Sequence, residues 1–553
     1  MKYLRWISGA LRDQRMAVAV MMLCHVLLAG CAVAFVYVSK RLVDCAVLMF
    51  GGASCNDDLA VLAAFMVGIV LTRIGLNALR GYLQVVTEIR LKNRLRRRLF
   101  DILLRMQTDG GKRRHTGDIL SRMQEDVRMV SSVCAASLPN IFGTLLQFAA
   151  AFVFLMILEP RLGLIIVIVA PVGILAGKFV TSRIRKLTHD IRESDAKVQS
   201  HLQESVQNIT LLQSMEYADA SASSLGELQG GLYGDELRRA KFSILSRIVM
   251  AIAFQAAQTV AFLWAVFGIS KGTVTYGMMT AFLQLVGQIQ RPLVDLSSQI
   301  PTLIHATASI DRIMELEALP REEDVEPCML PGTAGVRFEG VSFSYPDAVK
   351  PILTDFSYNF KPGSRTAILG PTGVGKSTMI RLLLSLLRPQ GGSITVYSGG
   401  LSGQGEVSSP ASPATRCNLV YVPQGNSLFS GSVRDNLLMG NPEATEEQLR
   451  EALHTAAADF VLDLPSGMDT QCFESGGGLS EGQAQRIAIA RALLRPGSIL
   501  LLDEFSSALD SETEITLMQR LTASLPGHTM IFITHRDRII DFCDSVLRLG
   551  GEA

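Results

Sequence analysis

Residues 370–378 read Gly-Pro-Thr-Gly-Val-Gly-Lys-Ser-Thr, a match to the phosphate-binding pattern G-x-x-x-x-G-K-[ST]. Before them, residues 365–369 form an apolar run with the length of a buried strand, and after them residues 376–387 have the pattern of a helix that ends at Arg388-Pro389. Glycines between a strand and a helix let the backbone approach phosphates, and the free N–H groups of a helix start attract negative charge. The stretch predicts a nucleoside triphosphate site, and an ordinary glycine-rich turn is the alternative.

Each part of this stretch has an expected task. Lys376 would reach the β- and γ-phosphates. Ser377 would offer its hydroxyl to Mg²⁺, which prefers oxygen ligands and retained waters. The loop that wraps the phosphates is expected to consist of Gly370, Pro371, Thr372, Gly373, Val374, Gly375 and Thr378.

Two carboxylates follow a second buried-strand run. Residues 499–504 read Ile-Leu-Leu-Leu-Asp-Glu, so the strand ends in Asp503 and Glu504. Because successive strand residues face opposite sides, the two carboxylates should have different tasks. One can hold Mg²⁺ through water while the other polarises an attacking water, as phosphoryl transfer requires. The alternative is an Asp-Glu pair used only for solvation.

The composition divides the chain into two parts. Its 553 residues exceed one domain, and 52 basic against 51 acidic side chains give no overall attraction to nucleic acid. Nearly all long apolar runs lie before residue 305, and the nucleotide motifs lie after residue 335. Between them, residues 317–334 are acidic, contain three prolines and lack periodicity, which predicts a linker.

Six apolar stretches have about the 20 residues that a helix needs to cross a bilayer. They lie near Met16–Val38, Leu59–Leu79, Ser137–Leu158, Leu162–Val180, Ile248–Ile269 and Met278–Pro301. A buried helix of a soluble protein is an alternative for one such stretch but not for six. The last stretch is the weakest candidate, because Gln284, Gln288, Gln290 and Arg291 interrupt it.

The distribution of Lys and Arg predicts the orientation. Residues 1–15 and the segment 80–136 are rich in both, whereas the loops 39–58, 159–161 and 270–277 are short and poorly charged. Both termini are therefore expected in the cytoplasm, and the protein is expected to be a multi-pass protein of the plasma (inner) membrane.

The segments 80–136 and 181–247 carry mixed charge at helical spacing, which predicts membrane helices that extend far into the cytoplasm. Each is interrupted once, at Asp109-Gly110-Gly111 and near residues 208–218. These breaks are candidate elbows that contact another domain. Surface hairpins without a partner are the alternative.

Several polar side chains lie within the predicted spans, where burial in lipid is costly. They are Arg73, Asn77, Gln147, Gln255, Gln258, Gln284 and Gln288. They could line a water-filled path, or they could join helices by hydrogen bonds. Nine cysteines show no metal-ligand spacing, and only Cys45 and Cys55 share an external loop where a disulfide could form.

The nucleotide-binding half contains four further motifs besides the phosphate-binding stretch and the Asp503-Glu504 pair. Leu479-Ser480-Glu481-Gly482-Gln483 opens a helical run through Ala492. The other three are Tyr-Val-Pro-Gln at 421–424, Ser507-Ala508-Leu509-Asp510 and Thr534-His535-Arg536. Together with Tyr345, which ends a strand-like stretch at 336–345 and could stack on an adenine ring, they resemble the motifs of an ATP-binding cassette (ABC) transporter of the exporter type, built as one half.

The resemblance implies a role for each motif residue. Residues 479–483 resemble the signature, with Ser480, Gly482 and Gln483 facing a partner's ATP. Gln424 resembles the Q-loop residue that senses Mg²⁺ and the attacking water, Asp503 and Ser377 hold the metal, Glu504 is the general base and His535 contacts the γ-phosphate. Residues 507–510 resemble the D-loop, and Glu474 with Gly476 the exporter X-loop.

The resemblance also implies an architecture. We expect an α-helical membrane domain of six transmembrane helices over residues 1–316, the linker 317–334, and an α/β P-loop nucleotide-binding domain with a helical subdomain over residues 335–553. ATP and Mg²⁺ are the expected cofactors. The expected partners are membrane lipid, a second half-transporter in a homodimer or heterodimer, and a transported small molecule, lipid or peptide, with no nucleic acid.

Two features depart from the family's pattern. Glu481 stands where the signature usually has glycine, and its charge would oppose a partner's γ-phosphate if it pointed inward. It either swings outward in a competent homodimer or marks one half of a heterodimer with unequal sites. Residues 398–416 form a polar insert that reads as a flexible surface loop.

The expected activity is ATP hydrolysis coupled to export or flipping of a substrate. An ATP-gated channel or a regulatory membrane ATPase of the same fold is the alternative. A soluble cassette ATPase would have no use for six spans, and importers usually keep their membrane and nucleotide domains on separate chains.

Overall fold

The computed structural model describes residues 2–50, 58–107, 116–346, 348, 350–371, 373–399, 405–473 and 478–550. Within these ranges, the side chains of residues 4, 116, 162, 165–178, 181, 293, 294, 297 and 298 are not described. The chain forms two compact units. One comprises residues 1–100 and 117–317, and the other comprises residues 101–116 and 318–553.

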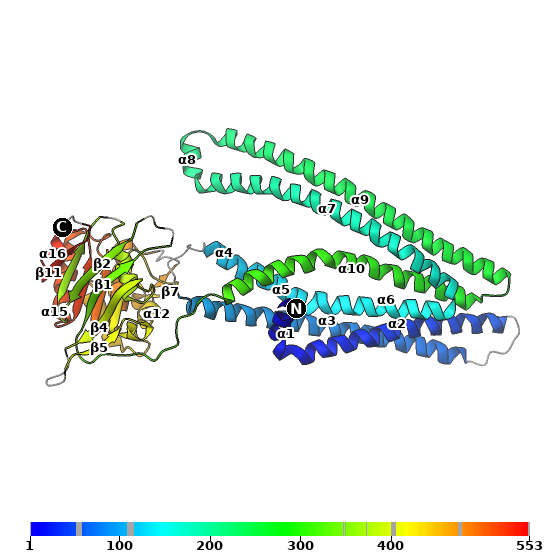
Figure 1. The fold of residues 1–553 in the computed structure, drawn as a ribbon, viewed down its shortest axis with the longest axis horizontal. Helices are drawn as coiled ribbons and strands as arrows, with labels where there is room; N and C mark the ends of the chain where they lie inside the picture. The colour runs from blue at the N-terminus through cyan, green and yellow to red at the C-terminus, as the bar shows by residue number, and fades with distance from the viewer. Residues whose placement is uncertain are drawn as a thin grey trace. The chain divides into compact units, whose positions relative to one another are not determined.

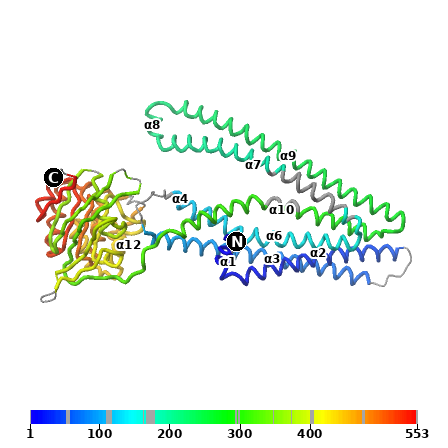
Figure 2. Tube along the Cα trace, in the orientation of Figure 1, coloured from blue at the N-terminus to red at the C-terminus, as the bar shows by residue number. Residues whose placement is uncertain are grey.

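The first unit consists of long helices (Figure 1). They are α1 (Lys2–Ala10), α2 (Arg15–Phe50), α3 (Leu59–Leu104), α4 (Thr116–Ser121), α5 (Val127–Ser132), α6 (Leu138–Leu158), α7 (Pro160–Gln207), α8 (Ile209–Ser214), α9 (Ala218–Ser270) and α10 (Tyr276–Glu317). Short π-helical turns at 122–126 and 133–137 flank α5. Figure 2 shows α7 and α9 running side by side with α8 at one end of the pair.

Four described helical segments are long and apolar enough to cross a membrane: Arg12–Phe50, Leu59–Leu104, Gly117–Leu158 and Ala218–Ser270. They contain four of the six predicted spans. The other two predicted spans lie in α7 and α10, helices of 48 and 42 residues. The 46 residues of α3 correspond to about 69 Å at 1.5 Å per residue, more than twice the apolar thickness of a bilayer.

The predicted interruption near residue 208 is confirmed. Asn208 leaves helical geometry at φ −111° and ψ 26°, and the six-residue α8 separates α7 from α9. The other predicted interruption, at residues 109–111, lies outside the described residues. Cys45 is disulfide-bonded, and its predicted partner Cys55 also lies outside them.

Apolar side chains of four helices form the core of the first unit. Val36 of α2, Leu155 of α6, Ala265 of α9 and Phe282 of α10 are all completely buried in one cluster. Glutamine joins helices here as well, since Gln284 Nε2 donates to Ser39 Oγ at 3.1 Å. Gln255 and Gln258 are exposed on α9.

The second unit contains a parallel sheet in the order β11-β3-β10-β9-β6. Its strands are β3 (Arg365–Leu369), β6 (Leu419–Val422), β9 (Ile499–Asp503), β10 (Thr529–Ile533) and β11 (Ser545–Arg548). Alternate residues of β9 enter different apolar cores, Leu500 and Leu502 on one side and Ile499 and Leu501 on the other. Burial on both faces explains why these strands read as continuous apolar runs.

An antiparallel sheet in the order β2-β1-β4-β5 covers one of these cores. It comprises β1 (Ala334–Phe343), β2 (Leu353–Phe360), β4 (Gly391–Ser398) and β5 (Val407–Pro410). The helices of the unit are α11 (Lys376–Leu383), α12 (Val433–Leu438), α13 (Glu446–Thr455), α14 (Glu481–Leu493), α15 (Ser511–Ser524) and α16 (Asp537–Ile540), and β7 (Gly431–Ser432) pairs with β8 (Gln471–Cys472).

Two local predictions are wrong. The helix after the phosphate-binding stretch ends at Leu383 rather than Leu387, because Ser385 adopts a left-handed backbone with φ 53°. The insert at 398–416 is not wholly a loop. Residues 407–410 pair with β4 as an edge strand, where Pro410 is tolerated, and residues 413–418 form a 3₁₀ helix that buries Asn418. Residues 400–404 lie outside the description.

The segment after α10 is anchored within the second unit. Arg416 donates to both carboxylate oxygens of Glu322 at 2.6 Å, and Asn418 accepts from Leu330 N at 2.8 Å. Arg321 also forms an isolated bridge with Met106, at the end of α3. The predicted linker is thus held at several points along its length.

Candidate functional site

Four neighbouring parallel strands end at one edge of the sheet, and each is followed by a predicted motif. The phosphate-binding stretch follows β3, His535 follows β10, Glu504 follows β9 and Gln424 follows β6. The carboxyl edge of an open α/β sheet is where ligands bind in this class of fold. Strand order therefore brings together residues that are up to 165 positions apart.

The backbone of the phosphate-binding loop has conformations that favour glycine. Gly373 has φ 90° and Gly375, the residue before α11, has φ 109°. A Cβ atom on Gly375 would lie 2.5 Å from Ile352 Cγ2, so the position also lacks space for a side chain. Thr372 lies outside the described residues. The free N–H groups at the start of α11 border this loop.

Lys376 joins this loop to the strand β10. Its Nζ donates to Gly370 O at 2.5 Å and lies 2.7 Å from His535 Nε2. Because an ammonium group only donates, His535 accepts at Nε2 in this arrangement. Burial lowers the pKa of Lys376, and the negative charges of Glu504 and Asp503 partly oppose that shift.

Glu504 is the centre of a second set of contacts. Its Oε2 accepts from Gln424 Nε2 at 2.5 Å, and its Oε1 lies 3.3 Å from His535 Nε2. The residue has φ 47°, a conformation that is uncommon for a side chain other than glycine. The left-handed backbone at Glu504, rather than strand alternation, therefore gives this side chain a different direction from that of Asp503.

Asp503 has a different environment, as the sequence predicts. Only 5% of it is exposed, and the hydroxyls of Ser377 and Tyr421 lie near its carboxylate. Burial raises its pKa, and the charge of Glu504 raises it further. Burial next to Asp503 also raises the pKa of Tyr421 to about 12.

The oxygen atoms of Ser377, Asp503 and Gln424 fit a hard cation such as Mg²⁺. Within the described ranges, no group of three His, Cys, Asp or Glu side chains could hold a metal by itself. Mg²⁺ usually binds with one or two carboxylates plus phosphate oxygens and waters, so this sparse donor set agrees with a nucleotide-bound metal.

Tyr345 lies beside the start of α11. Its hydroxyl is 3.2 Å from Thr378 Oγ1 and accepts from Arg381 at 3.3 Å. Its ring packs edge-on against Phe343, with centroids 5.1 Å apart. The ring is partly exposed, which leaves a face for stacking.

The predicted signature forms the start of α14. Ser480 is the N-cap: its Oγ accepts from Gln483 N at 3.2 Å, while Gln483 Oε1 accepts from Ser480 N at 2.9 Å. Gly482 allows close packing on the D-loop, since a Cβ atom there would lie 2.7 Å from Ala508 O. Glu481 is exposed.

These signature residues do not join the phosphate side of the site. Across the described part of the chain, no hydrogen bond or ion pair connects Ser480, Gly482 or Gln483 with the phosphate-binding loop, Asp503, Glu504 or His535. Glu474 and Gly476, the predicted X-loop residues, lie outside the description.

The structure adds residues that motif matching missed. Gln485 is 1% exposed and donates to Glu504 O at 3.2 Å, which links α14 to the segment that follows β9. Arg491 donates to Ser427 Oγ at 2.7 Å, so the same helix also reaches the segment after Gln424. A buried glutamine within the apolar face of a helix is the sequence signal for the first of these contacts.

Comparison with known proteins decides the family. The transmembrane-region model of ABC transporters matches residues 18–293, and the ABC transporter nucleotide-domain model matches residues 353–507. The chain belongs to the ABC transporter family. It has an exporter-type arrangement, with the membrane region and the ATPase domain in one polypeptide, so it is a multi-pass membrane protein that binds ATP and couples its hydrolysis to transport.

Two relatives and one solved structure illustrate the match. The ABC transporter is 30% identical over 418 residues to the mycobactin import ATP-binding/permease protein IrtB of Mycolicibacterium smegmatis, covering 75% of this chain and 71% of IrtB. It is 28% identical over 424 residues to the fatty acid ABC transporter ATP-binding/permease protein of Mycobacterium bovis, covering 76% and 66%. A bacterial Atm1-family ABC exporter with ATP bound has the same fold, with a TM-score of 0.78 over 98% of this chain and 95% of that chain at 23% identity.

Proposed function

We propose that this ABC transporter works as a dimer of half-transporters that exports or flips an amphipathic substrate and hydrolyses ATP at composite sites between two chains. The observation that carries this proposal is the separation of the two halves of the nucleotide site. Lys376, Glu504 and His535 share one contact network, whereas Ser480, the N-cap of α14, has no hydrogen bond or ion pair with these three side chains among the described residues. A helix start without its own phosphate is completed by a second chain's ATP.

The site residues have the following proposed roles. Lys376 exchanges its contact with His535 for the β- and γ-phosphates, and His535 then contacts the γ-phosphate. Glu504, already bonded to Gln424, accepts a proton from the attacking water. Ser377, Asp503 and Gln424 would hold Mg²⁺, which supplies charge neutralisation at the phosphates when it is bound.

The remaining roles concern the adenine ring, the phosphate-binding loop and the signature residues. Tyr345 would stack on adenine. The backbone of Gly370, Pro371, Thr372, Gly373, Val374, Gly375 and Thr378 would surround the phosphates. Ser480, Gly482 and Gln483 would contact the partner's ATP.

Each of the three segments predicted from the sequence has a proposed role. Residues 1–316 would form the substrate path in the plasma (inner) membrane with both termini in the cytoplasm. Residues 317–334 would be the linker, and residues 335–553 the ATPase. The names of two relatives include mycobactin import and fatty acid transport, so the direction of transport is measured together with ATP turnover.

ATP turnover in proteoliposomes tests this proposal. Purified protein should hydrolyse Mg-ATP in a vanadate-sensitive manner, and a suitable substrate should change the rate and accumulate in the lumen. An ATP-gated channel would instead pass solute down its gradient when ATP binds, without one turnover per transport event. Substrate flux that continues at the same rate with a non-hydrolysable ATP analogue would favour that alternative.

Glu481 tests the composite site. Its side chain is exposed at the first turn of α14, where the partner's phosphates would lie. Removal of its charge in Glu481→Gly should strengthen ATP-driven dimerisation if the carboxylate faces the interface. Unchanged ATP affinity and turnover in that variant would show that this charge does not tune the site.

A further inference from the structure

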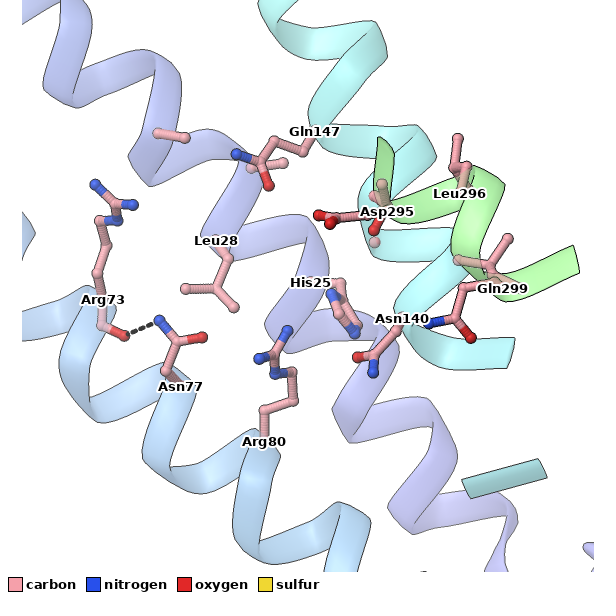
Figure 3. A pocket seen from close by; sticks show the side chains of 15 residues that line it. His25, Leu28, Arg73, Asn77, Arg80, Asn140, Gln147, Asp295, Leu296 and Gln299 are labelled. Carbon is pink, nitrogen blue, oxygen red and sulfur yellow. Dashed lines mark hydrogen bonds between the residues drawn. The ribbon is translucent and has the colours of Figure 1, made fainter. Parts of the chain in front are cut away.

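A polar cavity of about 350 Å³ lies among α2, α3, α6 and α10 of the membrane unit (Figure 3). The side chains that line it recur three or four residues apart on each helix, so each helix presents one face to the cavity. The polar members are His25 on α2, Arg73, Asn77 and Arg80 on α3, Asn140, Thr144 and Gln147 on α6, and Asp295 and Gln299 on α10.

The cavity lies within the apolar stretch of α3. Arg73 and Arg80 are 14 and 21 residues from the first residue of α3, which is about 21 and 32 Å along a helix. The apolar core of a bilayer is about 30 Å thick, so Arg73 lies in the half of the core farther from Leu59, and Arg80 lies at the far boundary of the core. A charged side chain at the depth of Arg73 is costly and usually serves a substrate or ion pathway.

Two nitrogen atoms in the cavity have no partner. Among the described residues, buried side-chain nitrogens without a hydrogen bond occur at two positions, His25 Nε2 and Arg80 Nε, and both residues line this cavity. His25 is only 6% exposed. A buried polar group without a partner costs free energy that a bound ligand with hydrogen-bond acceptors would recover.

The position of the His25 ring is fixed by α6. A Cβ atom built on Gly143 would lie 1.8 Å from His25 Nδ1, so the Nδ1 edge of the ring packs against this glycine. The Nε2 atom is on the opposite edge of the ring. Figure 3 shows the side chains of His25 and Arg80 extending from α2 and α3 toward the same space.

Charge and shape indicate the ligand. Two guanidinium groups face one carboxylate in the cavity, an excess of one positive charge. The guanidinium of Arg73 lies 5.8 Å from the centroid of Phe35, which holds it near an apolar surface. Apolar side chains complete the lining: Leu28, Ala29, Ala32, Ile141 and Leu296.

From this arrangement we infer that the cavity binds the anionic group, carboxylate or phosphate, of an amphipathic molecule. Arg80 and Arg73 bind the anion, His25 donates from Nε2, and the apolar lining contacts the start of the hydrocarbon chain. Only the statement that the bound molecule is then transported rests on the proposed function. A transported amphiphile and an anionic lipid head group share this chemistry.

Binding can be measured on the full chain in phosphatidylcholine nanodiscs without nucleotide, with dodecyl phosphate as the anionic probe and dodecanol as its neutral counterpart. Calorimetry should show saturable binding of dodecyl phosphate and none of dodecanol. Arg80→Gln and Arg73→Gln should each weaken binding by about tenfold or more, as loss of a charge-assisted hydrogen bond does. Arg90→Gln is the matched control, since it removes an exposed arginine of the same helix outside the cavity.

Equal affinity of the wild type and Arg80→Gln, or equal binding of dodecanol and dodecyl phosphate, would overturn the inference. If the arginine variants do not fold, the wild-type comparison of the two probes decides the question alone. Repetition in phosphatidylglycerol nanodiscs identifies the source. Weaker binding of dodecyl phosphate there, because phosphatidylglycerol competes for the cavity, assigns the site to a lipid head group. Undiminished binding of dodecyl phosphate assigns the site to a free amphiphile. Both outcomes support an anion site. Because no nucleotide is present, failure of ATP turnover would leave this result intact.

Discussion

The sheet edge of the ATPase domain and the polar cavity of the membrane unit are both clusters of charged side chains, but they are built in opposite ways. At the sheet edge, strand ends deliver Lys376, Glu504 and His535 into direct contact with one another. In the cavity, helix faces surround a space, and His25 and Arg80 each keep an unpartnered nitrogen.

The difference shows how the two clusters are specified. Phosphate chemistry is common to all ATP-driven proteins of the family, so its residues occur in contiguous motifs. A cargo site has no such constant ligand, and its residues are spaced singly along four helices. The following predictions test this contrast, beginning with the largest effect.

Loss of the general base should have the largest effect. Glu504→Gln keeps the shape of the side chain but removes its basicity, so ATP turnover should fall by about 10²–10⁴-fold while ATP binding persists. Steady-state hydrolysis and nucleotide-binding assays on the same preparation measure the two quantities. Glu512→Gln, an exposed position on α15, is the control of equal charge. Turnover near the wild-type rate in Glu504→Gln would remove Glu504 from the mechanism.

Gly482 should tolerate no side chain. An alanine Cβ there would lie 2.7 Å from Ala508 O, so Gly482→Ala should displace the D-loop and destabilise the ATPase domain by about 1–3 kcal/mol. Chemical denaturation and ATP turnover measure the effect. The control is Gly230→Ala in α9, where nothing lies within 4 Å of the added atom. Equal stability of the two variants would contradict the close packing of the signature on the D-loop.

A glycine in the membrane unit should behave similarly but affect a different function. Gly143→Ala should displace the His25 ring and destabilise the helix packing by about 1–3 kcal/mol, with weaker binding of dodecyl phosphate and unchanged basal ATP turnover. Gly143→Ala combined with His25→Ala should recover most of the lost stability, because the clash is removed. Gly30→Ala, with open space around it, is the control. A double variant less stable than either single variant would refute the contact.

The smallest effect concerns Asp503. Its folded-state pKa is raised by burial and by Glu504, so its ionised form destabilises the nucleotide-free fold. Asp503→Asn should therefore raise the melting temperature at neutral pH while it weakens metal-dependent ATP binding. The gain should shrink as pH falls through the raised folded-state pKa, and it should vanish below the ordinary carboxyl pKa of about 3.9, where Asp503 is protonated in both the folded and the unfolded state. Melting curves recorded from about pH 4 to about pH 8 for the wild type and the variant measure this trend.

Asp510 is the contrasting control. It caps α15 by accepting from Glu512 N and Thr513 N, and these bonds lower its pKa. Its charge therefore stabilises the fold above the ordinary carboxyl pKa, and Asp510→Ala should lower the melting temperature through loss of the helix cap. Similar shifts in both variants would show that burial does not distinguish the two carboxylates.

Much of the ATPase site could be predicted from sequence, because its residues are consecutive and its strands are apolar on both faces. The expectation that Asp503 and Glu504 have different environments agrees with the structure, but its stated reason was incomplete. Strand alternation ends at Asp503, and the left-handed backbone of Glu504 sets the direction of the second carboxylate. A positive φ at a residue other than glycine leaves no mark in the sequence.

The membrane cavity was only partly predictable. Arg73, Asn77 and Gln147 are unusual in apolar spans and do line the cavity. His25 and Asp295 gave no comparable signal, and Gln255 and Gln258 lie outside the cavity. Helical periodicity places a residue on a face, but the neighbour that the face meets depends on how four helices pack.

The sequence by itself determined the phosphate loop, the carboxylate pair, the apolar spans and hence the family, because each depends on the chemistry of consecutive residues. Only the tertiary structure decided that four strand ends meet at one edge, that Gln485 links the signature helix to Glu504, and that His25 and Arg80 share a cavity. The physical reason is that contacts between distant residues depend on strand order and helix packing, which no local pattern records.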